Sequence, residues 1–127
     1  MILEGPVAVY DRVSINNFVI TKYTEIDYPE KIPVVWNYEF DDHELVLGFA
    51  EISKVENGLW ATVHVIHELF KSIILDRGKI CCGGYYRNVE FRTWHDGVIY
   101  VDKAELPALG VYESGDEWVY LKIKEED

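Results

Sequence analysis

The sequence predicts a mainly β protein of the α+β class: an antiparallel β-barrel or strongly curved sheet, with one amphipathic helix at about residues 67–79 packed against it. Three observations predict this class. Short segments of alternating or continuous apolar residues recur between turn signals along most of the chain. Asn57-Gly58 and Asp96-Gly97 are dipeptides typical of tight hairpins. A single segment changes to helical spacing, and its apolar stripe requires a sheet surface to cover.

Strands and turns alternate through the first half of the chain. Ser14-Ile15-Asn16-Asn17 supplies turn chemistry after the first strand, and the stretch after residue 23 is polar enough to be a loop. Pro33 stands just inside a later strand, where a missing N–H is tolerated. Asn57-Gly58 then reverses the chain, so the two strands that it joins should be antiparallel. The expected β segments of this half are residues 5–13, 18–20, 34–39, 45–55 and 59–66, with 24–31 as loop.

The second half begins with the predicted helix, which Gly78 is expected to end. Strands then return on both sides of Asp96-Gly97. Residues 106–112 are expected to be irregular around Pro107, and the alternating tail 117–124 to form a closing strand with one wet face. The apolar stripe of the helix consists of Leu69, Phe70, Ile73 and Ile74, and the strands are residues 80–94 and 98–105.

Composition indicates a single globular domain, residues 1–127, because this length is sufficient for one hydrophobic core. The formal net charge of -11 would repel nucleic-acid phosphates and anionic membranes, so neither is an expected partner. No apolar run approaches the ~20 residues of a membrane-spanning helix, and the first residues lack the features of a signal peptide. Synthesis in the cytoplasm is therefore expected, and the acidity is more simply explained by solubility than by mimicry of DNA.

The two cysteines of the chain, Cys81 and Cys82, are adjacent. A disulfide between neighbouring residues is strained and rare, so reduced thiols are expected. Free cysteine behaves as a small hydrophobe, and packing beside Gly83 and Gly84 is the favoured interpretation of both.

A series of short motifs resembles the caudovirus prohead protease family, the enzymes that trim scaffold protein during capsid maturation and whose fold resembles the herpesvirus assemblins. The resemblance covers about residues 5–112. It is carried, in order, by Ile32-Pro33-Val34-Val35-Trp36-Asn37-Tyr38, Gly48-Phe49-Ala50, Asn57-Gly58-Leu59-Trp60-Ala61, Arg77-Gly78-Lys79 and Cys81-Cys82-Gly83-Gly84-Tyr85.

The resemblance implies that the catalytic positions are substituted. Tyr38 stands where the family has its histidine base, Cys81 where it has a serine nucleophile, Ala108 where an acidic residue is usual and Gly110 where a serine is usual. A nucleophile needs an adjacent base, and that base needs an orienting partner. A phenol with a pKa near ~10 is protonated at neutral pH and cannot accept the proton. The implied protein is a non-catalytic relative.

Two alternatives remain open. Cys81 could act with His64 as a cysteine hydrolase that processes scaffold or capsid protein, if strand 59–66 runs beside the strand of Cys81. The aromatic residues could instead form a carbohydrate-binding surface, although packing is favoured for most of them. They are Trp36, Trp60, Trp94, Trp118, Tyr85, Tyr86, Tyr100, Tyr112 and Tyr120.

No metal or cofactor is expected. His64, His67 and Glu68 are close in sequence, but the predicted change from strand to helix between them removes the fixed helical face of a zinc site. The acidic run at residues 41–44 lacks the spacing of a calcium loop. Cys82-Gly83-Gly84 precedes a strand and not a helix, so it does not have the form of a phosphate-binding loop.

The expected function is therefore a binding or structural role in phage or prophage head assembly, with a scaffold or capsid protein as partner and a homo-oligomer as a possibility. The expected location is the host cell cytoplasm or the virion. This function comes from the resemblance alone.

Overall fold

The computed structural model describes residues 1–14, 16–36, 46–93, 96–113 and 115–124. Strands dominate this part of the chain, with one short helix between β6 and β7. In chain order the elements are β1 (Ile2–Val9), β2 (Phe18–Val19), β3 (Glu25–Asp27), β4 (Ile32–Trp36), β5 (Val46–Val55), β6 (Gly58–Val65), α1 (Glu68–Arg77), β7 (Lys79–Thr93), β8 (Ile99–Tyr112) and β9 (Tyr120–Ile123).

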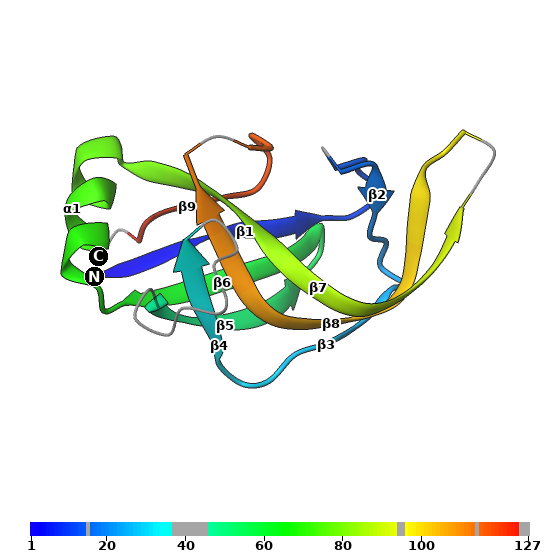
Figure 1. The fold of residues 1–127 in the computed structure, drawn as a ribbon, viewed down its shortest axis with the longest axis horizontal. Helices are drawn as coiled ribbons and strands as arrows, with labels where there is room; N and C mark the ends of the chain where they lie inside the picture. Colours follow the sequence, from blue (N-terminus) through cyan, green and yellow to red (C-terminus); the bar gives the residue numbers. More distant parts are fainter. Residues whose placement is uncertain (15, 37–45, 94–95, 114, 125–127) are drawn as a thin grey trace.

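Seven of the described strands close into a barrel (Figure 1). Neighbours follow the order β8, β4, β5, β6, β1, β9 and β7, and β7 pairs with β8 to complete the ring. The predicted mainly β fold, a barrel with one helix, is confirmed. Most neighbouring strands are antiparallel as expected, but β2, β3 and β4 each pair with β8 in parallel.

The hairpin of β5 and β6 forms where the Asn57-Gly58 pair predicted it. The two strands are antiparallel along their length, from Val55 opposite Gly58 to Gly48 opposite Val65. Gly58 also lies against β1, where a side-chain Cβ would overlap the carbonyl oxygen of Ala8. Glycine is therefore required here both for the turn and for the close approach of two strands.

The first strand is displaced from its predicted range of 5–13. β1 begins at Ile2 and ends at Val9, because Asp11 takes a left-handed conformation with φ 63° that turns the chain. The amide of Asp11 then donates to the carbonyl oxygen of Ile20 at 2.9 Å, which folds the connection back over the barrel.

Two segments expected to lack regular structure contain strand. The predicted loop at 24–31 includes β3, a strand of three residues whose only buried side chain is Ile26. Such a strand is too short for its alternation to be recognised. Residues 106–112, expected to be irregular, belong to β8. Pro107 is tolerated there because the pairing with β7 shifts register beside it, so no ladder bond is lost.

The far ends of β7 and β8 project from the barrel as an arm, at the end opposite the helix (Figure 1). Register shifts between Tyr85 and Phe91 bend this arm, and Asn88 adopts φ 51° within them. Glu105 on β8 holds the bend, because it accepts hydrogen bonds from Asn88 Nδ2 at 2.7 Å and from Arg87 Nε at 2.9 Å. These bonds, with that of Asn88 the larger cause, lower the pKa of the Glu105 carboxyl.

Helix α1 matches the predicted helix and ends at Gly78, whose φ of 82° suits glycine. Only Phe70 and Ile74 of the helix are fully buried. Leu69, which was expected in the apolar stripe, is 64% exposed, so that part of the prediction is wrong. The helix contacts the barrel through a narrower stripe than its sequence suggests. Within the described residues, no helix has the length and apolar character needed to cross a bilayer.

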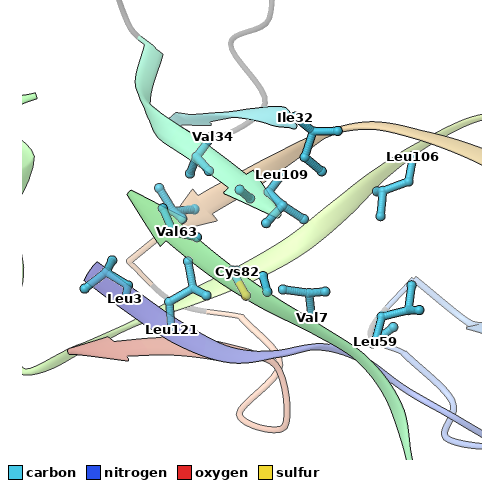
Figure 2. Close-up of a cluster of buried hydrophobic side chains, with 14 of the residues drawn as sticks. Leu3, Val7, Ile32, Val34, Leu59, Val63, Cys82, Leu106, Leu109 and Leu121 are labelled. Atoms are coloured by element: carbon cyan, nitrogen blue, oxygen red, sulfur yellow. The ribbon is translucent and has the colours of Figure 1, made fainter. Parts of the chain in front are cut away.

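The core fills the inside of the barrel with aliphatic side chains (Figure 2). Leu3 and Val7 of β1 pack with core side chains from three other strands, and each of these residues is at most 3% exposed. The partners are Val63 of β6, Leu109 of β8 and Leu121 of β9. The predicted closing strand contributes the last of these, although β9 is shorter than the predicted 117–124.

Candidate functional site

The two cysteines point to opposite faces of β7. Cys82 is completely buried and lies among the core side chains in Figure 2. Its thiol is directed at the carbonyl oxygen of Pro6, with Sγ 3.8 Å away. Burial, and to a smaller degree the neighbouring Cys81, raise the pKa of the Cys82 thiol far above its usual range. Cys82 is therefore a packing residue, as predicted, and is unsuited to act as a nucleophile.

Cys81 is half-buried and has the opposite orientation on the strand. It lies across from Tyr112 of β8 and Tyr120 of β9. Among the described residues no imidazole hydrogen-bonds to its sulfur. The position that the resemblance gives to the nucleophile is thus occupied by a free thiol between two tyrosine-bearing strands.

His64 does not meet the condition for serving as the base of Cys81. Its strand β6 is separated from β7 by two others, β1 and β9. With strands about 4.8 Å apart, the two backbones are roughly 14 Å from each other along the sheet. His64 is exposed while Val63 and Val65 beside it are buried, so its imidazole points away from the barrel. Strand 59–66 thus does not run beside the strand of Cys81, which was the condition for this alternative.

The other positions that the sequence resemblance singles out offer little chemistry. Ala108 is buried on β8, opposite Tyr85, and supplies only a methyl group. Ala108 lies four residues along β8 from Tyr112, which pairs with Cys81. The distance between Ala108 and Tyr112 along the strand is roughly 13 Å. Gly110 lies opposite Gly83. Tyr38 lies outside the described residues, as does the acidic run at 41–44.

The aromatic residues divide between packing and surface. Trp36 packs against the core, as do Phe18 and Tyr86, whose rings meet edge to face with centroids 5.9 Å apart. Trp118 is 48% exposed, and the guanidinium of Arg12 covers its ring at 3.5 Å from the centroid. Trp94 lies outside the described residues.

A groove that the sequence did not predict lies where β9 ends. We call it the seam groove, because it lies between β1 and β7 at the point where β9 no longer separates them. It encloses about 80 Å³ and continues toward the arm as a wider hollow of about 430 Å³. The groove is lined mainly by residues 7–9, Phe18, Gly83, Gly84, Tyr86 and Trp118, and the hollow by Val89, Phe91, Ile99 and Val101.

The walls of the seam groove are mostly apolar. Arg12 and Asp116 are the charged residues among its described lining, and the guanidinium of Arg12 is stacked on Trp118. Asp116 accepts a hydrogen bond from the Trp118 amide at 3.1 Å. Ser14 Oγ is likewise engaged, by the amides of Asn16 and Phe18. Apolar walls with fixed polar groups at the edge are typical of a binding site.

The lack of a side chain at Gly84 shapes this groove. A Cβ at Gly84 would lie 2.7 Å from Cζ of Tyr86 and 2.8 Å from Cδ1 of Leu106. The absence of a side chain at Gly84 therefore lets the Tyr86 ring fold back along β7 toward Phe18. The consecutive glycines at 83 and 84 are the available signal in the sequence, but such a pair does not by itself predict a groove.

The histidines near the helix do not form a metal site with their neighbours. His64 is exposed on β6, whereas His67 precedes the first turn of α1. In the described part of the chain, no three histidine, cysteine, aspartate or glutamate side chains are grouped as metal ligands would be.

Comparison with known proteins adds no relative: no family model matches the chain, and no curated protein or solved structure is significantly similar to it.

Proposed function

We propose that this chain is a non-catalytic, prohead-protease-like barrel of a phage or prophage, which binds a protein partner during head assembly. The observation that supports the absence of catalysis is the surroundings of Cys81. The neighbouring strands bring it tyrosines rather than a histidine, and two strands, β1 and β9, lie between its strand and that of His64. A thiol without a positioned base lacks the assistance that cysteine hydrolases use.

The position equivalent to the orienting acid supports the same conclusion. A methyl group at Ala108 can neither hold an imidazole in place nor stabilise its charged form. The role of the orienting acid is therefore unfilled at Ala108, and the described residues bring no base to the thiol of Cys81. The link to head assembly rests on the sequence resemblance. A barrel with one helix agrees with the fold that the resemblance implies, but a shared fold does not by itself establish a shared function.

A protein partner suits the surface of this chain. The net charge of -11 favours a basic partner, such as a segment of scaffold or capsid protein, and opposes nucleic acid. A carbohydrate is less suited, because Arg12 already covers one face of the exposed Trp118 ring. The proposed location is the host cytoplasm or the assembling virion.

A peptidase assay tests the absence of catalysis. Purified protein and its Cys81→Ala variant are each incubated for a day with casein and with a pool of random peptides, and all masses are followed by mass spectrometry. The proposal expects no cleavage of substrate or of the protein itself in either sample. Cleavage by the wild type that the variant lacks would establish the cysteine hydrolase instead.

The genes beside that of this chain test the assembly role. Neighbouring reading frames for a portal and a major capsid protein are the expected result. A neighbourhood of metabolic enzymes would contradict a role in head assembly while leaving the absence of catalysis intact.

A further inference from the structure

β9 is much shorter than the strands on either side of it. It pairs with Leu3 and Glu4 of β1 and with residues 79–81 of β7. One more bond follows, from the amide of Cys82 to the carbonyl oxygen of Val119 at 3.2 Å. β1 then continues to Val9 and β7 to Thr93.

A local turn explains why β9 begins so late. Asp116 accepts hydrogen bonds from the amide of Trp118 through its side chain and from the amide of Val119 through its carbonyl oxygen, at 3.1 and 3.2 Å. This Asp-led turn directs the preceding chain away from the barrel wall. The seam groove lies in the direct extension of β9, between residues 7–9 of β1 and Gly83-Gly84 of β7.

The groove suits an extended chain better than a compact ligand. Side chains along a strand alternate between two faces, so an added strand would direct every second side chain toward the apolar groove wall. Phe18 and Tyr86 line that wall, and the hollow beyond it is lined by Phe91 and Val101.

The charges around the groove indicate which side chains the occupant would carry at the alternate positions that do not face the groove wall. The two arginines of the arm are already paired with carboxylates, Arg87 with Glu105 and Arg92 with Asp102, each at 2.9 Å. Arg12 is stacked on Trp118. With the cations engaged in this way, the net charge of -11 sets the long-range potential, which attracts basic segments and repels a second copy of the chain.

We infer that the seam groove binds an extended segment of a protein partner, in which apolar residues alternate with lysine or arginine, as an additional strand that continues β9. The segment would run antiparallel to both β1 and β7, as β9 itself does. This inference rests on the proposed binding function and adds the site and the chemistry of its partner.

Synthetic peptides test the inference on the full chain. The probe is a capped octapeptide of alternating lysine and valine, titrated calorimetrically at low salt. Three comparators vary one property each: glutamate in place of lysine, the same residues in two blocks, and alternate backbone amides methylated. The expected result is a micromolar Kd for the probe and binding at least about tenfold weaker for each comparator.

The place of binding is tested by variants and by amide exchange. Trp118→Ala, in the groove wall, is expected to weaken the probe about tenfold, whereas Leu69→Ala, which removes an exposed apolar side chain on the helix, should leave it unchanged. Amide exchange of the wild type should slow at residues 7–9 and 83–84 when the probe is bound. This second measurement does not depend on how well either variant folds.

Several results would overturn the inference. Equal binding of the glutamate peptide would refute the basic partner, and equal binding of the methylated peptide would refute strand addition. Protection only at other residues would refute the site, and a concentration-dependent dimer protected at the same residues would make a second copy the occupant. Cleavage of the probe would instead refute the proposed non-catalytic function, and the exchange data would still report where the peptide binds.

Discussion

Replacing Cys82 with alanine should change how the stability of this protein depends on pH. The folded barrel keeps the Cys82 thiol protonated because burial raises its pKa far above the usual value. The unfolded chain exposes the same thiol, which ionises above about pH 8.5. The unfolded state therefore releases a proton that the folded state retains, so the stability of the wild type falls as the pH rises above that value.

The size of this effect follows from the difference between the two states. At pH 10 the unfolded thiol is about 1.5 units above its pKa, which at 1.36 kcal/mol per unit corresponds to about 2 kcal/mol of lost stability. Cys82→Ala lacks this contribution. The free energy of unfolding of the wild type relative to the variant should thus fall by about 2 kcal/mol between pH 7 and pH 10.

Urea denaturation at the two pH values, under reducing conditions and followed by circular dichroism, measures this difference. Val111→Ala is the matched control, because Val111 is buried directly opposite Cys82 on β8 and does not titrate. It should lower stability by a similar amount at both pH values. An equal fall of stability in the wild type and in Cys82→Ala would refute the conclusion that the thiol is held neutral in the core.

Three further predictions test the fold. Glu105→Gln should lower the melting temperature slightly at pH 7, and this difference should disappear as the pH falls through the lowered pKa of the carboxyl, where the wild type loses the same charge. Gly84→Ala should destabilise by about 1–3 kcal/mol in urea and change the near-ultraviolet circular dichroism, since its Cβ would displace the Tyr86 ring. Phe70→Ala should cost about 3–5 kcal/mol, whereas the exposed Leu69→Ala should change stability by less than about 0.5 kcal/mol. Each of three results would contradict the structure. They are a stable Gly84→Ala with an unchanged spectrum, equal effects of the two helix substitutions, and a Glu105→Gln difference that persists in acid.

Local features of this fold could be predicted from the sequence. The Asn57-Gly58 turn, the Gly78 helix end and the β5–β6 hairpin depend on residues close together in the chain. Their conformations are decided by nearby backbone preferences, which a short stretch of sequence contains.

Features set by strand pairing could not be predicted in this way. Pro107 suggested an irregular segment, but a register shift with β7 accommodates it within β8. His64 could act on Cys81 only if their strands were neighbours, but the order of strands places β1 and β9 between them. Strand order depends on contacts between distant segments, which alternation along one strand does not encode.

The seam groove depends on the same long-range information. Its walls come from the end of β1, the segment around Phe18, the middle of β7 and the turn before β9. The sequence predicted a closing strand across residues 117–124, which would have filled the groove. The Asp116 turn shortens that strand, and side-chain turns of this kind compete with strand pairing.

Alkylation of Cys81 tests the absence of an activated nucleophile most directly. Wild type and Cys81→Ala are treated with iodoacetamide from pH 5 to pH 9, and the modified residue is identified by peptide mass. The account predicts slow labelling of Cys81 throughout the acidic range, and none of Cys82, because the core buries that thiol completely. Rapid, selective labelling of Cys81 at pH 5–6, abolished in the variant, would reveal an activated thiolate and contradict the non-catalytic assignment.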